Sequence, residues 1–347
     1  MTDGDRALSR RDVMATAAIG VGAGLLSEIA PRPVAAQTAE AKHGASAKMW
    51  SREYWAHKGD VSLYMFRKRR AAPRKGEAPL PVLFLVHGSS ISSRPSFDLT
   101  VPGRGEYSVM NIFAEYGFDV WTMDHENYGR SSRSDGNSDI ANGVEDLKVA
   151  LELVARETGQ QKLHLFGESS GALRAAAYAM VNPERVDRLV LSAFTYKGEG
   201  SPTLAKRAEA VDYYRTHNRR LRDRDMIRSI FTRDKPGTSD PAVGEFLADQ
   251  ELKFGDQVPT GTYLDMTANL PVVDPLKVLA PVLLLRGEYD GIATVDDLVA
   301  FYEQLPSGDR QFVILPATAH SVVLGSNRQL FWHAMRAFLT MPAHSEA

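Results

Sequence analysis

Residues 162–181 constrain the fold more tightly than any other stretch of the sequence. A short apolar run, Leu163 to Phe166, leads into the turn Gly167-Glu168-Ser169-Ser170-Gly171, and an alanine-rich helical pattern follows. This order predicts a buried strand, a sharp turn and a helix, with Ser169 on strained backbone at the apex. The two glycines lack Cβ atoms, so strand and helix can approach closely on either side of the turn.

Apolar runs and helical patterns alternate on both sides of this segment. Continuous apolar runs are typical of parallel strands that are buried on both faces. They occur at 82–86, 118–123, 187–192, 282–285 and 311–315, and helical patterns occur at 107–116, 140–158, 295–305 and 328–339. A hairpin around Gly59-Asp60 is expected at 54–66. The pattern predicts an α/β protein with a doubly wound, mostly parallel sheet.

The alternation is interrupted between residues 198 and 270. This region carries polar, helical patterns at 204–226 and 241–254, and no strand is evident in it. A helical insertion of this kind is expected to form a cap over the carboxyl edge of the sheet, where open α/β sheets bind ligands. We therefore predict a core formed by residues 51–197 and 271–341, with residues 198–270 as an inserted helical cap.

The N-terminus predicts export. The run Ser9-Arg10-Arg11-Asp12-Val13-Met14 precedes a weakly apolar stretch and the small residues Val34-Ala35-Ala36. This arrangement resembles a twin-arginine signal peptide, so residues 1–36 are expected to be removed and residues 37–50 to form a disordered lead-in. The mature protein would act in the periplasm or outside the cell, without stable membrane insertion. An N-terminal anchoring helix is the alternative, but the apolar stretch is short for a membrane span and contains Glu28.

Composition excludes several classes of function. The chain has no cysteine, which rules out disulfides, thiolate metal sites and a cysteine nucleophile. A formal net charge of −2 gives no general reason to expect nucleic acid or an anionic membrane as a partner. No His-x-x-x-His pair or acidic cluster indicates a metal, and we expect neither a metal nor a cofactor. No pattern indicates an oligomeric state.

A serine at the apex of such a turn becomes a useful nucleophile only if a base accepts its proton. That base needs a partner to fix its tautomer and stabilise its charged form. Asp290 follows the apolar run 282–285, and His320 follows the run 311–315. Because parallel strands end at one edge of a sheet, both side chains are expected beside Ser169. We therefore predict Ser169 as nucleophile, His320 as base and Asp290 as its acidic partner.

The order Ser169, Asp290, His320 resembles that of the α/β-hydrolase superfamily, and the similarity covers roughly residues 63–339. The loop with Asp124, Gly129 and Ser131 and the pair His87-Gly88 resemble further family loops. The resemblance implies an oxyanion hole formed by the backbone N–H groups of Ser89 and Ser170, with Ser90 as an alternative to Ser89. It also implies that His87, the second candidate for the base, serves the structure of its loop. Glu168 either tunes the site or only decorates the turn.

A serine nucleophile points to acyl transfer. We expect an exported carboxylic ester hydrolase that acts on a small-molecule substrate through an acyl-enzyme. The alternatives are a lactonase, an amidase, a C–C bond hydrolase or an acyltransferase on the same residues, or a non-catalytic binding protein on this scaffold. Residues 201–235 hold ten Lys and Arg against five Asp and Glu. They form either a solvated helical face with ion pairs or a surface that attracts an anionic substrate.

Overall fold

The structure, a computed structural model, describes residues 49–342. The predicted signal peptide and nearly all of the lead-in therefore lie outside the described residues. The first strand begins at Trp50, one residue inside the predicted lead-in, so that boundary is corrected. None of the helices within residues 49–342 is long and apolar enough to cross a membrane.

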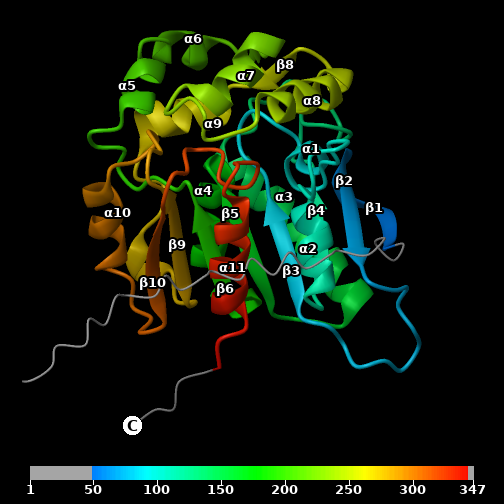
Figure 1. Cartoon of the computed structure of the whole chain (residues 1–347). Coiled ribbons are helices and arrows are strands. Elements are labelled where there is room, and N and C mark those ends of the chain that lie inside the picture. Colours follow the sequence, from blue (N-terminus) through cyan, green and yellow to red (C-terminus); the bar gives the residue numbers. More distant parts are fainter. Residues whose placement is uncertain (1–48, 343–347) are drawn as a thin grey trace, which may run out of the picture. The chain divides into compact units, whose positions relative to one another are not determined.

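An eight-stranded sheet lies at the centre of this part of the chain (Figure 1). Its strands, in spatial order, are β1 (Trp50–Lys58), β2 (Val61–Arg69), β4 (Asp119–Met123), β3 (Val82–Val86), β5 (Leu163–Glu168), β6 (Val186–Ser192), β9 (Val282–Gly287) and β10 (Arg310–Leu315). The first two strands form the expected antiparallel hairpin, and it is longer than predicted. The other six strands run parallel, which confirms the mostly parallel sheet.

Helices cover both faces of the sheet. The apolar side chains of α3 (Ile140–Thr158), α4 (Ser170–Val181) and α10 (Val295–Tyr302) pack into one core layer. Those of α2 (Val109–Glu115) and α11 (Arg328–Leu339) pack into the other, near the short helix α1 (Ser93–Phe97). In α3 the apolar residues fall at helical spacing and are buried, as the sequence predicts. Helices on both faces confirm the doubly wound α/β class.

The segment between β6 and β9 lies above the carboxyl ends of the strands (Figure 1). It contains α5 (Pro202–Ala208), α6 (Val211–Thr216), α7 (Arg224–Thr232), α8 (Pro241–Glu251) and α9 (Gly261–Leu264). Two short strands, β7 (Arg219–Leu221) and β8 (Gln257–Pro259), pair within it. The expectation of one helix over 204–226 without a strand is therefore wrong. Three-residue strands are too short to show a period, and Asp223 starts a new helix by accepting a hydrogen bond from the Met226 N–H. We call residues 198–270 the cap.

A buried ion pair ties the cap to the loop after β3. Arg222 donates to Glu251 within the cap, and both side chains are almost completely buried. Glu251 Oε2 accepts hydrogen bonds from the Ser92 N–H at 3.1 Å and from its hydroxyl at 2.6 Å. Arg222 also donates to the carbonyl of Ser90 at 3.2 Å. The cap is thus fixed directly to the loop in which the predicted oxyanion donor lies.

Candidate active site

Ser169 occupies the predicted apex between β5 and α4. Its backbone has φ 58° and ψ −125°, a strained conformation for a residue with a Cβ atom. The two flanking glycines are required by close backbone contacts. A Cβ atom on Gly167 would lie 2.4 Å from the carbonyl oxygen of Gly171, and one on Gly171 would lie 2.2 Å from that of Val86. The turn therefore holds the serine side chain in one direction, beside the amino end of α4.

Asp290 and His320 meet in the loops after β9 and β10. His320 Nδ1 lies 2.9 Å from Asp290 Oδ1, and both side chains are buried. The Ile292 N–H also donates to Asp290 Oδ1 at 2.9 Å. Burial alone would raise the pKa of Asp290, but His320 and the hydrogen bonds outweigh it and hold that pKa below its usual value. An ionised carboxylate here can accept the Nδ1 proton and leave Nε2 free as a base.

Ser169 and His320 line the same pocket. Within residues 49–342 the Ser169 hydroxyl makes no hydrogen bond to His320 in this structure, which is common where a catalytic contact tightens only on binding. The sheet side of the pocket also includes Gly88, Ser89, Ser90 and Glu168, and the cap side includes Arg207, Ile230, Phe231, Arg233 and Leu247. The site therefore lies between the carboxyl edge of the sheet and the cap.

The two predicted oxyanion donors lie side by side. The Ser89 hydroxyl donates to Ser170 Oγ at 2.7 Å, and Thr262 of the cap donates to Ser89 Oγ at 2.9 Å. Ser170 is the first residue of α4, where backbone N–H groups have no acceptor within the helix. Among the described residues the Ser89 N–H donates to no other protein atom. Ser90 instead engages the cap, because its hydroxyl contacts the Tyr263 hydroxyl at 2.7 Å. The Ser90 N–H likewise donates to no other protein atom among the described residues, so Ser89 and Ser90 both stay candidates for the second donor.

His87 holds the loop that carries Ser89. Its Nδ1 lies 2.8 Å from the carbonyl oxygen of Gly88, and its Nε2 accepts the His125 N–H at 3.1 Å. Burial lowers the pKa of both imidazoles well below the ordinary value, so both are neutral near pH 7. With both ring nitrogens of His87 occupied, this side chain serves the loop and not proton transfer.

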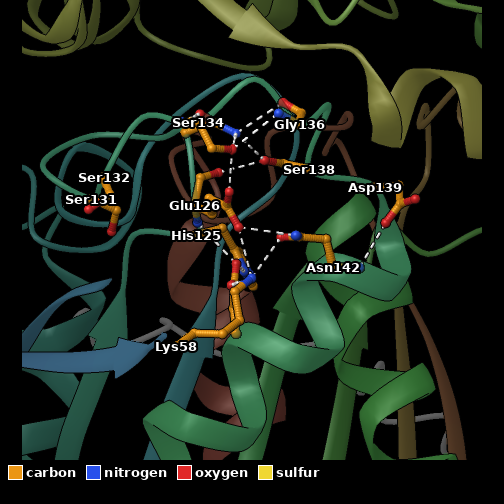
Figure 2. A network of polar contacts seen from close by, with 12 residues as sticks. Lys58, His125, Glu126, Ser131, Ser132, Ser134, Gly136, Ser138, Asp139 and Asn142 are labelled. Carbon is orange, nitrogen blue, oxygen red and sulfur yellow. Dashed lines mark hydrogen bonds and ion pairs between the residues drawn. The ribbon is translucent and has the colours of Figure 1, made fainter. Parts of the chain in front are cut away.

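His125 belongs to a network of polar contacts that includes Lys58 and Glu126 (Figure 2). His125 Nδ1 lies 3.1 Å from Asp146 Oδ2 on α3, and Lys58 of β1 donates to Asp146 Oδ1 at 2.5 Å and to Glu126 at 2.8 Å. Sequence reasoning missed these residues. Asp146 could have been noticed, because it shares a helix face with the buried Gly143 and Ala150. The network connects the hairpin strand β1 to the oxyanion loop through His87.

Glu168 also lines the pocket, next to Ser169. Burial raises the pKa of Glu168 from 4.5 to about 8, and the nearby charge of Asp290 acts in the same direction. At neutral pH most of this carboxyl group is therefore protonated. Glu168 thus contributes to the wall of the pocket, and its protonated carboxyl group adds little negative charge there.

Two arginines bring positive charge to the cap side of the pocket. Within residues 49–342, Arg207 donates only to Met266 Sδ, at 3.9 Å, and its guanidinium lies 5.1 Å from the centre of the Tyr263 ring. Burial, with Arg233 nearby, lowers the pKa of Arg207 to about 10. No carboxylate pairs with Arg207 among the described residues, whereas Arg215, Arg224 and Arg228 form exposed ion pairs. The exposed ion pairs fit a solvated helical face, whereas Arg207 and Arg233 line the pocket.

Asp234, also from the cap, lies beside Asp290 and His320. One oxygen or nitrogen atom of each side chain lies within 4.8 Å of the others. No sequence pattern singles out Asp234. A cation bound among these groups would occupy the predicted base, and we assign no metal to the site.

The sequence is similar to those of known hydrolases. A family model described as serine aminopeptidase, S33, matches residues 100–327. A 2-hydroxy-6-oxononadienedioate/2-hydroxy-6-oxononatrienedioate hydrolase from Paraburkholderia phymatum is 34% identical over 132 residues, which are 35% of this chain and 38% of that protein.

Solved structures show the same fold. A 2-hydroxy-6-oxo-6-phenylhexa-2,4-dienoate hydrolase from Rhodococcus sp. strain RHA1 has a TM-score of 0.60 at 19% identity, over 84% of this chain and 100% of that one. Carboxylesterase CesB from Bacillus subtilis has a TM-score of 0.59 at 18% identity, over 86% of this chain and 94% of that one. At such identities the likeness concerns the fold alone, which is that of the α/β-hydrolases.

Proposed function

Because the chain belongs to the serine aminopeptidase S33 family within the α/β-hydrolase superfamily, we propose that it is a serine hydrolase that cleaves a carboxylic ester. One observation carries the proposal. The strained Ser169 shares a pocket with His320, whose Nδ1 is 2.9 Å from a buried carboxylate. A serine, an imidazole and a carboxylate in this relation suit acyl transfer, and binding alone would not require all three.

The first half of the proposed reaction forms an acyl-enzyme. Ser169 Oγ attacks the acyl carbon while His320 Nε2 takes the hydroxyl proton, and the Asp290 carboxylate stabilises the resulting imidazolium. The developing oxyanion is held by the N–H groups of Ser170 and Ser89. Loss of one such donor typically costs about 3–4 kcal/mol of transition-state stabilisation. His320 then returns the proton to the leaving alcohol, and the ester bond breaks.

The second half releases the acid. Water enters the place of the alcohol, His320 takes a proton from it, and its oxygen attacks the acyl carbon of the ester on Ser169. The second tetrahedral intermediate uses the same two N–H groups, and His320 returns its proton to Ser169 Oγ. The apolar side chains Ile230, Phe231 and Leu247 offer contacts for the substrate on the cap side.

The charges on the pocket wall support an anionic substrate. Arg207 and Arg233 both line it, and the carboxyl group of Glu168 is largely neutral at pH 7. An isolated charge in a partly buried position is costly unless something pairs with it, and a substrate carboxylate would pair with Arg207. The same charges disfavour the free α-amino group that an aminopeptidase must bind.

A second candidate is cleavage of a C–C bond next to a ketone. The relative from Paraburkholderia phymatum, which matches 35% of this chain, is named for dicarboxylate substrates, and that name agrees with the two arginines. The same Ser169, His320 and Asp290 would act, and a carbanion would leave in place of an alcohol. A lactonase, an amidase and an acyltransferase use the same residues and differ in the group that leaves or accepts the acyl unit.

A hydrolysis screen tests the proposal. Purified protein would be offered neutral and carboxylate-bearing esters, lactones, aminoacyl anilides and a 2-hydroxy-6-oxo-dienoate, with Ser169→Ala as the control. We expect the carboxylate-bearing esters to be cleaved fastest, and Ser169→Ala to be inactive. Faster cleavage of the dienoate would favour the second candidate. Equal turnover by wild type and Ser169→Ala would contradict both.

We also propose export, on the grounds of residues 9–36. The pair Arg10-Arg11, the weakly apolar stretch and the small residues before Gln37 support it. N-terminal sequencing of the protein recovered outside the cytoplasm would test this. A start near residue 37 is expected, and an intact Met1 would contradict cleavage.

A further inference from the structure

Asp234 is a cap residue that reaches the predicted acid–base pair. It lies two positions after α7, and its side chain is only 5% exposed. A carboxylate oxygen of Asp234, one of Asp290 and a ring nitrogen of His320 lie within 4.8 Å of one another. Gly291, next to Asp290, leaves room for this approach, since a Cβ atom there would be 2.8 Å from Asp234 Oδ1.

The buried carboxylate of Asp234 has fewer hydrogen-bond donors near it than a buried carboxylate usually has. Asp234 Oδ2 is buried without a hydrogen-bond partner among the described residues, and so is Asp290 Oδ2. The ion pair that Asp234 makes there, with Arg233 Nε at 3.5 Å, is longer than a normal hydrogen bond. A buried carboxylate without a close donor is costly, and a nearby cation reduces that cost. The imidazolium that His320 forms during acyl transfer is such a cation.

We propose that Asp234 is a positioning residue, a second carboxylate, supplied by the cap, that stabilises the charged form of His320 together with Asp290. The inference rests on the proposed function. In each step the proton moves from Ser169 Oγ, or from water, to His320 Nε2 and on to the leaving group. Asp234 takes part in none of these proton transfers. With the cap in place, the charged form of His320 has two carboxylate partners, whereas the sheet side alone supplies only Asp290.

The other charges around these groups come from both sides of the pocket. Glu168 faces the site from β5, and burial raises its pKa to about 8, so that below this pH it adds little negative charge. Arg233 partly offsets both carboxylates. The other titratable side chains that line the cavity beside Asp234 are Lys206, Arg207, Arg220, Tyr263 and Tyr289. Asp290 and Asp234 are therefore the two carboxylates that this arrangement places beside His320.

The rate of fluorophosphonate labelling tests the inference without knowledge of the substrate. Labelling needs Ser169 and its base, so its rate reports on His320. It would be measured from pH 5 to 9 for wild type, Asp234→Asn and Asp234→Glu. The matched control is Asp212→Asn, which removes an exposed cap carboxylate. Thermal unfolding of each variant would show that it is folded.

We expect removal of the charge to make the imidazolium less stable. In Asp234→Asn the acidic limb of the rate profile should move about one pH unit lower, and the plateau should fall several-fold. Asp234→Glu should restore the limb, and Asp212→Asn should match wild type. If Asp234→Asn does not fold, Asp234→Ser removes the same charge with a smaller side chain.

Two outcomes would overturn the inference. One is that Asp234→Asn or Asp234→Ser folds, is labelled at the wild-type rate and keeps the acidic limb of the wild-type pH profile. The other is wild-type labelling that requires added Zn²⁺ or is abolished by EDTA, because the three groups would then hold a cation. A folded wild type that is not labelled at any pH would refute the proposed function itself, and the two failures are therefore distinguishable.

Discussion

On the sheet side of the pocket, backbone atoms in direct contact hold the reacting groups, whereas on the cap side long side chains reach into the same space. Gly167 and Gly171 have no room for a Cβ atom, and the two ring nitrogens of His87 contact backbone groups of Gly88 and His125. Arg207 and Arg233 extend from short cap elements and make few close contacts. In the proposed reaction the sheet side therefore positions the reacting groups, and the cap side contacts the substrate.

The largest effect is expected from Asp290→Asn, on the sheet side. An asparagine cannot hold the His320 tautomer or stabilise its charge, and the comparable change in a serine protease lowers kcat about 10⁴-fold. We expect a loss of about 10³- to 10⁴-fold in kcat here, because Asp234 retains part of the stabilisation. The measurement is kcat on the best substrate of the screen. A loss below tenfold would mean that the sheet side does not supply the acid.

Gly171→Ala tests whether backbone contact holds the turn. The new Cβ atom would lie 2.2 Å from the Val86 carbonyl oxygen and 2.6 Å from that of His87. Because these contacts are with backbone atoms, relieving them requires a shift of the main chain. We therefore expect the free energy of unfolding to fall by about 3 kcal/mol or more. Urea denaturation measures it. Gly308→Ala is the matched control, because nothing lies within 4 Å of a Cβ atom there. Equal stability of the two variants would contradict this account of the turn.

Arg207→Met tests the cap side. The variant keeps an unbranched apolar side chain and removes the charge, so carboxylate-bearing esters should lose about 10- to 100-fold in kcat/KM. Neutral esters of the same acyl size should be almost unaffected, and added salt should reduce the wild-type preference. Arg215→Met removes an exposed, ion-paired cap arginine as the control. Equal losses on neutral and anionic esters would show that Arg207 supports the fold and not the substrate.

The smallest effect is the pH dependence expected from Glu168. Burial raises its pKa from 4.5 to about 8, so between these values the folded protein holds a proton that the unfolded chain has released. The free energy of unfolding therefore falls as pH rises through this window. Glu168→Gln should show a flatter profile, by about 1 kcal/mol between pH 5 and 8. Denaturation across this range measures it, with the exposed Glu145→Gln as control. Parallel profiles would contradict the raised pKa.

The same contrast explains what the sequence could predict. The strands β3 and β5 and the turn at Ser169 are local patterns, and the structure has them as expected. Asp290 and His320 could be placed because parallel strands end at one edge. The cap was predicted poorly, since its three-residue strands and short helices carry no period. The contacts of Asp234 are with residues far away in sequence, and no local pattern predicts them. Asp146 is different, because its place on the buried face of α3 could be read from the helical spacing.

Covalent labelling of the folded protein tests the central claim most directly. After reaction with a fluorophosphonate, peptide mapping by mass spectrometry would locate the adduct. The account predicts one adduct, on Ser169, and none in Ser169→Ala. A folded wild type without an adduct, or with an adduct on another residue, would contradict it and favour a binding protein on this scaffold.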